Sequence, residues 1–371
     1  MRILIDNRLS AYRGGGIPQY TQQLIAALAD QIEHDRLIVL DHRKQTDQIG
    51  PDERIKRHRV WTPPHHRWEQ WALPIEIAPL GADVLHFPDF IPLWRVHQPN
   101  VITVHDLAFK RFPDILDAAA QRYYGQIERA VERAAAIIVP SHSTQRDLIE
   151  LLGVDLDRID VIYEAAAPHF TPRDLPPNDH RSINGVSLQR DQFALFVGTI
   201  EPRKNLHVLV EALALLSARD RSPVPPLVVA GARGWLDDAL YDRIRQLGVA
   251  EVIHFVGSVD RDQLIWLYNA CRVYLHPEVY SGFGLPILEA MQCGAPVIAA
   301  NTSSLPEVVG DAGLLVSPHD PHGWADTWLG AWHDSGLRDG LRRAGFDQAA
   351  RFSWAAAARD TLAVYRRVYQ R

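Results

Sequence analysis

The chain is poor in cysteine and contains no long apolar run. Its 371 residues include two cysteines, Cys271 and Cys293, which have neither CxxC spacing nor a matching group of histidines. We therefore expect the two cysteines to be buried apolar side chains of a protein in a reducing compartment, and not metal ligands or part of a disulfide framework. No stretch approaches the roughly 20 apolar residues that span a bilayer. The opening MRILIDNRL places charges where a signal peptide needs an apolar stretch. These absences predict a cytoplasmic protein.

An excess of basic residues is also absent. The net charge is −6. Residues 1–170 hold 19 Lys and Arg against 23 Asp and Glu (19 − 23 = −4), and the remainder hold 20 against 22 (20 − 22 = −2). Neither half is basic, which argues against nucleic acid as a partner. The length predicts two domains, each large enough for its own core.

Short apolar strands alternate with amphipathic helices along the chain. This alternation predicts an α/β fold with parallel sheets and helices on both faces. Residues 171–192 are polar, proline-rich and aperiodic, so we expect a linker there, and the pattern restarts at Phe193–Val197. The prediction is two doubly wound, Rossmann-like domains, 1–175 and 190–354. Ligands are expected in the cleft between them, at the carboxyl ends of strands.

The most informative segment is LHPEVYSGFGLPILEAMQCG, residues 275–294. A strand, Val273–His276, leads into a glycine loop, and Pro286 is expected to open a helix with Glu289 in its first turn. Backbone N–H groups at a helix start bind phosphate, and the Glu289 carboxylate suits ribose hydroxyls. The alternative is an ordinary glycine loop before a helix whose acidic first turn complements its dipole.

A second segment, GTIEPRKN, occupies residues 198–205 at the end of another predicted strand. Asn205 is expected to cap the next helix. Arg203 and Lys204 would then lie beside a helix N-terminus, where they suit a diphosphate. They would also stabilise a leaving phosphate without a metal. The alternative is a solvated basic loop.

The first half carries two weaker indications. Glycines 14–16 follow the first strand and permit close approach to a ligand, although the spacing is not that of a GxGxxG fingerprint. A surface loop is the alternative. His105 ends a buried strand, where it would hydrogen-bond a sugar or take part in proton transfer. Alternatively it is structural, its ring held by Asp106. Residues 155–157 spell DLD, which we interpret as a loop and not as a metal site.

Residues 53–71 combine five Lys and Arg with Trp61, Trp68 and Trp71. Basic and tryptophan residues together favour a membrane surface or an anionic acceptor. The alternative is a strand and a helix that cover the first sheet.

Together these segments, with FSW at 352–354, resemble the GT-B glycosyltransferases of family 4. The resemblance implies transfer of a sugar from a nucleotide-diphosphate sugar with retention of configuration and without a required metal. It implies that a C-terminal helix, about 355–371, packs on the first domain, and that 254–259 line the base. It implies catalytic roles for His105, Arg203 and Lys204. It implies donor contacts by Gly15, Gly16, Thr199, Ser258, Ser281, Gly282, Phe283, Gly284, Leu285 and Glu289.

The chain departs from the family pattern at one position. The family often has two glutamates with seven residues between them, and the first is Ser281 here. Glu278 lies three residues earlier. A serine hydrogen-bonds a sugar hydroxyl but cannot act as a carboxylate nucleophile, so same-face substitution is favoured over double displacement.

The motifs look most like those of bacterial mannosyl- or hexosyltransferases of surface-polysaccharide and lipopolysaccharide assembly. We therefore expect GDP-mannose as donor, with UDP- or ADP-glucose as alternatives, a saccharide or polyprenyl-linked acceptor, and no further cofactor. A peripheral contact with the inner face of the membrane is an additional hypothesis. Two other functions remain: a non-catalytic sugar-nucleotide-binding protein and a non-hydrolysing epimerase.

Overall fold

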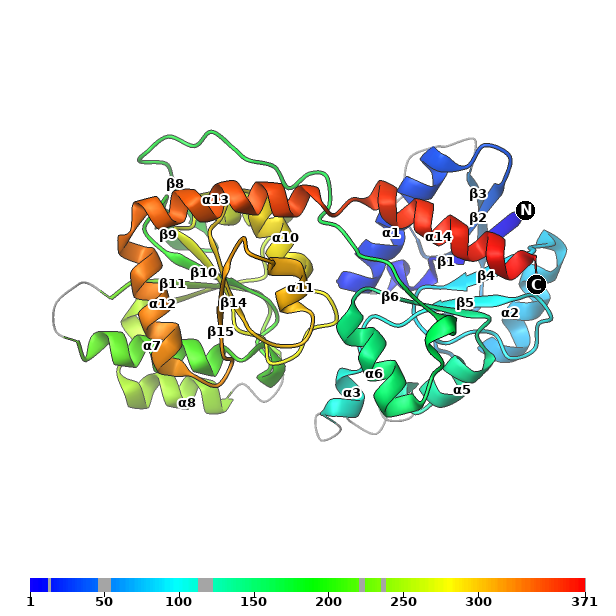
Figure 1. Cartoon of the computed structure of the whole chain (residues 1–371), viewed down its shortest axis with the longest axis horizontal. Helices are drawn as coiled ribbons and strands as arrows, with labels where there is room; N and C mark the ends of the chain where they lie inside the picture. The colour runs from blue at the N-terminus through cyan, green and yellow to red at the C-terminus, as the bar shows by residue number, and fades with distance from the viewer. Residues whose placement is uncertain (13–14, 46–54, 113–122, 220–223, 235–237, 371) are drawn as a thin grey trace. The chain divides into compact units, whose positions relative to one another are not determined.

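The computed structural model describes the whole chain except residues 13–14, 46–54, 113–122, 220–223, 235–237 and 371. It divides into two compact units (Figure 1). Unit 1 comprises Met1–Glu164 and Ser353–Arg371, and unit 2 comprises Ala165–Phe352. The first division thus lies before residue 175, where the sequence predicted the first domain to end.

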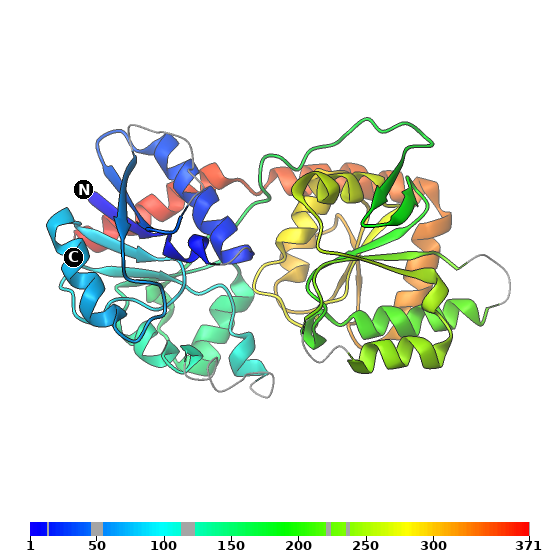
Figure 2. The same cartoon turned by 180° about the vertical axis from the view of Figure 1, so that it is seen from behind.

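Unit 1 is built on a seven-stranded parallel sheet in the order β3-β2-β1-β4-β5-β6-β7. Helices lie on both faces of the sheet, as Figures 1 and 2 show. Strands such as β4 and β5 are buried along their whole length, as expected for a parallel sheet covered on both sides. The elements are β1 (Arg2–Asp6), α1 (Gly16–Gln31), β2 (Arg36–His42), β3 (Ile55–Val60), α2 (Glu69–Ile77), β4 (Val84–Phe87), β5 (Asn100–Thr103), α3 (Ala108–Arg111), α5 (Ile127–Arg133), β6 (Ala136–Val139), α6 (His142–Leu152), β7 (Ile159–Val161) and α14 (Trp354–Tyr369).

The last helix, α14, packs on unit 1 beside α1 (Figure 1). Ser353 caps it by accepting a hydrogen bond from Ala356 N at 3.1 Å. Gln31 of α1 donates to the carbonyl oxygen of Ala355 at 2.6 Å. Inside the unit, the hydroxyl of Tyr365 lies 2.6 Å from His86 Nδ1. The helix is therefore part of the core of unit 1.

Unit 2 has a six-stranded parallel sheet in the order β12-β11-β10-β13-β14-β15. This is the second doubly wound sheet expected from the sequence. The elements are β8 (His180–Ile183), β9 (Val186–Gln189), β10 (Ala194–Val197), α7 (Leu206–Ser217), β11 (Leu227–Ala230), α8 (Asp238–Leu247), β12 (Ile253–Gly257), α9 (Arg261–Ala270), β13 (Val273–His276), α10 (Leu285–Gln292), β14 (Val297–Ala300), α11 (Leu305–Val309), β15 (Leu314–Val316), α12 (Pro321–His333) and α13 (Ser335–Ala350).

The prediction of a plain linker at 171–192 is wrong. Strands β8 and β9 form an antiparallel hairpin within it. Asn184 and Gly185 make its two-residue turn, with φ of 49° and 89°. Asn-Gly favours such turns because both residues tolerate positive φ. The Asn-Gly turn was overlooked because its flanking strands are short and polar and the segment is rich in proline. The hairpin serves unit 2, because Asn184 Nδ2 donates to the carbonyl oxygens of Val256 (2.6 Å) and Ser258 (2.9 Å).

The two cysteines are buried free thiols, which confirms their prediction as core side chains. Burial raises the pKa of the Cys293 thiol to about 12. Among the described residues, no helix is long and apolar enough to cross a membrane.

Each of the two parallel sheets has a topological switch point, between β1 and β4 in unit 1 and between β10 and β13 in unit 2. At such a point the connections from two adjacent strands leave in opposite directions and open a crevice at the carboxyl ends. Loops that begin at these points contribute to both candidate sites described below.

Candidate active site

The two motif loops of the second half meet at the switch point of unit 2. Loop 198–205 follows β10 and loop 277–284 follows β13, and these strands are neighbours. Val279 N donates to the carbonyl oxygen of Arg203 at 3.0 Å. Arg203 Nη1 donates to the carbonyl oxygen of Tyr280, also at 3.0 Å. The loops thus form one structure, as expected if both contact one ligand.

Asn205 has a different role from the predicted N-cap. It precedes α7 with φ of 55°, and its side chain makes no capping hydrogen bond. Its Nδ2 instead donates to the carbonyl oxygens of Pro277 (3.0 Å) and Pro318 (2.8 Å). The left-handed backbone turns the amide away from the helix, so it ties the motif loops together.

Arg203 and Lys204, expected to hold a diphosphate, are each paired with a carboxylate. Arg203 Nη2 lies 2.9 Å from Glu201 Oε1. Lys204 Nζ contacts Glu278 Oε1, and Arg203 Nη1 is 3.7 Å from Glu278 Oε2. The side chains of Arg203 and Lys204 remain 22% and 19% exposed. Two partly accessible cations therefore sit on two buried or nearly buried carboxylates.

His276, the last residue of β13, lies beneath this charge cluster. Its Nδ1 is 2.9 Å from the hydroxyl of Tyr274, and its Nε2 is 3.7 Å from Glu278 Oε2. Burial, and then the charges of Lys204 and Arg203, hold the pKa of His276 well below its usual range. The ring is thus neutral at pH 7.

The glycine loop is held from behind by two serines. Ser281 N donates to Ser303 Oγ at 2.9 Å. The hydroxyl of Ser304, which is fully buried, lies 2.8 Å from the carbonyl oxygens of both Ser281 and Phe283. Gly284, with φ of 111°, then turns the chain into α10. Gly282 is buried within this loop.

Helix α10 begins at Leu285, so Glu289 lies in its second turn. The prediction that it lies in the first turn is wrong. Pro286 is the second helical residue, where its missing N–H is still without cost. The Glu289 side chain is buried and accepts a hydrogen bond from the Tyr268 hydroxyl at 3.1 Å. Tyr268 therefore orients the carboxylate for which the resemblance implies a ribose contact.

Two further expected donor contacts, Thr199 and Ser258, are exposed at the carboxyl ends of β10 and β12. Both lie in unit 2. The hairpin residue Asn184 fixes the backbone at Ser258.

The remaining predicted site residues belong to unit 1. Gly15 and Gly16 are exposed at the start of α1, and Gly14 lies outside the described residues. His105 follows β5, with Nδ1 3.0 Å from Glu164 Oε1 and Nε2 2.9 Å from the carbonyl oxygen of Pro88. Burial opposes its charge, but the hydrogen bond and charge of Glu164 raise the pKa of His105 overall. Two acceptors thus favour the imidazolium. Glu164, not Asp106, holds the ring; Asp106 accepts from Ala108 N.

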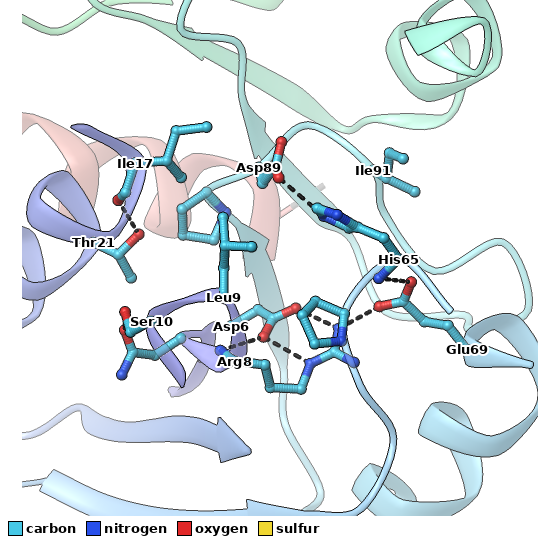
Figure 3. Close-up of a pocket in the computed structure, with 13 residues that line it drawn as sticks. Asp6, Arg8, Leu9, Ser10, Ile17, Thr21, His65, Glu69, Asp89 and Ile91 are labelled. Carbon is cyan, nitrogen blue, oxygen red and sulfur yellow. Dashed lines mark hydrogen bonds and ion pairs between the residues drawn. The ribbon is translucent and has the colours of Figure 1, made fainter. Parts of the chain in front are cut away.

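A pocket at the switch point of unit 1 was not foreseen (Figure 3). Its floor is the Arg8 guanidinium, 1% exposed, which is bonded to Asp6 (2.6 Å) and Glu69. Asp89 closes one side through an ion pair with His65 Nε2 at 2.9 Å. No motif marks these residues, because they come from four separate segments. Arg8 follows β1, Asp89 follows β4, and His65 and Glu69 follow β3, within the segment 53–71 that was noted for its basic and tryptophan residues.

Comparison with known proteins agrees with this architecture. Residues 14–167 match the family described as Glycosyltransferase Family 4, and residues 181–348 match Glycosyl transferases group 1. The O-antigen chain mannosyltransferase B of Escherichia coli is 30% identical over 99% of this chain and 100% of its own length. The chain belongs to glycosyltransferase family 4. This glycosyltransferase is also 34% identical to the D-inositol 3-phosphate glycosyltransferase of Jonesia denitrificans, over 95% of this chain and 91% of the relative.

The fold of the glycosyltransferase is GT-B, as predicted. The sucrose-phosphate synthase of Thermosynechococcus elongatus superposes with a TM-score of 0.78, at 20% identity, over 100% of this chain and 99% of its own. In this glycosyltransferase, Glu278 is the site residue that sequence reasoning undervalued. Its place three residues before Ser281 was visible, but its contact with Lys204 depends on how two loops meet in space.

Proposed function

We propose that this glycosyltransferase moves a hexose from a nucleotide-diphosphate sugar to a saccharide or polyprenyl-linked acceptor in surface-polysaccharide assembly. Mannose from GDP-mannose is the favoured donor, since the relative that matches along its full length is named an O-antigen chain mannosyltransferase. The observation that carries the proposal is the joining of Arg203 and Lys204 to the glycine loop at one switch point.

The proposed reaction proceeds with retention by same-face substitution. The bond from the anomeric carbon to the leaving phosphate oxygen breaks as the acceptor oxygen bonds to the same face. That acceptor hydroxyl passes its proton to the leaving phosphate. Arg203 and Lys204 stabilise the charge that develops on the leaving phosphate. Ser281 offers no carboxylate, so a trapped glycosyl-enzyme would contradict this mechanism.

Metal independence is part of the proposal. Two fixed cations meet the phosphate charge, so a divalent ion has no required task. Turnover should survive exhaustive treatment with EDTA, and dependence on added Mg²⁺ or Mn²⁺ would contradict it.

A donor panel tests the function. Thermal shifts with GDP-, UDP-, ADP- and dTDP-sugars identify the ligand, since a ligand stabilises the state that binds it. GDP-mannose should give the largest shift and be consumed when acceptor is added. Isomerisation of the sugar nucleotide without acceptor would favour an epimerase. Tight binding without turnover would favour a binding protein.

The acceptor is proposed to bind at the mouth of the unit 1 pocket, whose interior, about 20 Å³, has room for about one water molecule. Ser10 and Thr21 bring hydroxyls to the wall, while Asp89 brings a carboxylate (Figure 3). Arg8 is already bonded to two carboxylates, so the pocket suits sugar hydroxyls and not a phosphate. Asp89→Asn should raise KM for the acceptor and leave KM for the donor unchanged; an effect on donor alone would exclude this site.

Peripheral membrane contact is proposed for one face of α2. Trp68, Trp71 and Ile75 recur at helical spacing and are all more than half exposed, while Leu73 and Ile77 are buried. Arg95 stacks on Trp71 at 3.3 Å, and Arg43 stacks on Trp61 at 4.1 Å. Apolar and basic groups on one face suit an anionic headgroup layer.

Co-sedimentation with vesicles tests this contact. The triple change Trp68→Ser, Trp71→Ser, Ile75→Ser should abolish binding to phosphatidylglycerol vesicles. Leu156→Ser, an exposed residue elsewhere in unit 1, is the control. Equal binding to neutral and anionic vesicles would contradict the proposal.

A further inference from the structure

Glu278 is a buried carboxylate whose position in the glycosyltransferase has no assigned role. Its side chain is 1% exposed. Burial of a carboxylate is costly unless cations and hydrogen-bond donors surround it. Lys204 Nζ contacts one oxygen, while Arg203 Nη1 and His276 Nε2 each lie 3.7 Å from the other. The buried carboxylate therefore lies against both cations of the motif.

Ser281, three residues later, has the opposite character. Its main chain is fixed on both sides, through Ser303 and through the buried Ser304. Its side chain carries no charge and lies in the same loop as Glu278. Within residues 277–284, Glu278 is the single acidic residue. The carboxylate that the family resemblance implies at position 281 is therefore absent, and the single carboxylate of this loop lies three residues earlier.

We propose that the carboxylate has been transposed from position 281 to position 278, and that Glu278 is a positioning residue for Lys204 and Arg203. This inference rests on the proposed nucleotide-sugar chemistry. Glu278 holds the Lys204 ammonium in place before the donor arrives, so that no reorganisation is needed when charge develops on the leaving phosphate. It also balances charge, because Arg203 and Lys204 pair with Glu201 and Glu278, two cations against two carboxylates.

Charge balance sets the affinity for the nucleoside diphosphate product. Loss of the Glu278 charge leaves an excess cation that attracts diphosphate in the ground state and in the product. Binding therefore tightens, while the rate falls, because Lys204 is no longer held in position. A purely structural role for Glu278 would not produce tighter binding together with slower turnover.

The experiment compares wild type with Glu278→Gln, Glu278→Ser, Ser281→Glu and the double variant Glu278→Ser/Ser281→Glu. Donor kcat and KM, GDP affinity by calorimetry and Tm are measured for each. Glu251→Gln, an exposed glutamate of unit 2, is the matched control. Misplacement of a catalytic group by about 1 Å costs about 10²-fold, so the Glu278 single variants should lose about that factor in kcat.

Glu278→Gln should bind GDP about 10-fold more tightly, and Ser281→Glu should bind it more weakly because two carboxylates then face the diphosphate. The double variant, with one carboxylate again, should recover kcat to within about 5-fold of wild type. Such recovery is the non-additivity expected of coupled sites.

A double variant as slow as the product of the two single effects overturns the transposition. Weaker or unchanged GDP binding by Glu278→Gln overturns the positioning role, and if that variant does not fold, the double variant still decides. An inactive wild type refutes the proposed function instead, and so the two failures are distinguishable.

Discussion

The backbone N–H of Val279 donates a hydrogen bond to the carbonyl oxygen of Arg203 at 3.0 Å. Two segments separated by more than seventy residues are thereby joined within the site. In the opposite direction, the side chain of Arg203 donates a hydrogen bond to the carbonyl oxygen of Tyr280, also at 3.0 Å. Loops 198–205 and 277–284 consequently act as one unit, and a change in either should alter the binding of a diphosphate by both.

Lys204→Ala should reduce donor turnover at least ~10²-fold, since a preset charge that stabilises the leaving group contributes that much. Steady-state kinetics with the identified donor measure the loss. Arg245→Ala, an exposed arginine of α8, should retain wild-type rates. Near wild-type turnover by Lys204→Ala would remove this lysine from the mechanism.

Asn205→Ala should lower the free energy of unfolding by about 2–3 kcal/mol, because two hydrogen bonds are lost and alanine is strained at positive φ. Asn205→Gly keeps the backbone conformation and loses only the hydrogen bonds. Denaturant titration of both variants separates the two contributions. Equal destabilisation would mean that strain contributes little, and no effect in either would contradict the role of Asn205 as a tie.

Glu289→Ala tests the assignment of this carboxylate to ribose. It should weaken GDP binding by about 10-fold or more, as for a lost hydrogen bond to a charged group. Binding of 2′,3′-dideoxy-GDP, which lacks the hydroxyls, should not change. Tyr268→Phe, which removes the orienting hydroxyl, should also weaken the binding of GDP and not that of the dideoxy analogue, but by a smaller factor. Calorimetry with both ligands decides, and equal losses for both would exclude a ribose contact.

His86 should make unit 1 sensitive to acid. Burial, and then the charge of His105, lower the pKa of His86 to about 3. Between pH 6.5 and about 3 the unfolded chain therefore binds a proton that the folded chain does not. As the pH is lowered through this window, this group should reduce the free energy of unfolding by up to about 1.4 kcal/mol per pH unit.

His86→Gln, which still offers polar atoms to Tyr365 and Thr103, should flatten that slope. Denaturant midpoints of unit 1 between pH 7 and pH 4.5 provide the comparison. His105 does not obscure this comparison. Because the pKa of His105 is raised in the folded protein, its stabilising contribution is lost only as the pH rises above 6.5. Identical slopes in wild type and variant would contradict the burial argument.

The fold was largely predictable because buried parallel strands give continuous apolar runs. Strand β13 was predicted with the bounds that the structure gives it, and β10 begins one residue later than the predicted Phe193–Val197. The hairpin β8–β9 was missed because its strands are short and polar, although its Asn-Gly turn was present. The sequence pattern thus located the strands that are continuously apolar and missed the hairpin whose strands are polar.

The site was predictable in its residues but not in its contacts. Arg203 and Lys204 stood out as charges at a strand end, and the structure places them against the glycine loop. The capping role of Asn205 failed because its backbone adopts positive φ. The Arg8 pocket could not be foreseen, because its lining comes from segments far apart in sequence.

The most direct test follows the anomeric proton of the product by NMR while purified enzyme consumes GDP-α-mannose in the presence of a saccharide acceptor. The account predicts an α-linked product from the first turnover, formed in EDTA and lost in Lys204→Ala. A β-linked first product, or no transfer from any donor of the panel, would contradict it.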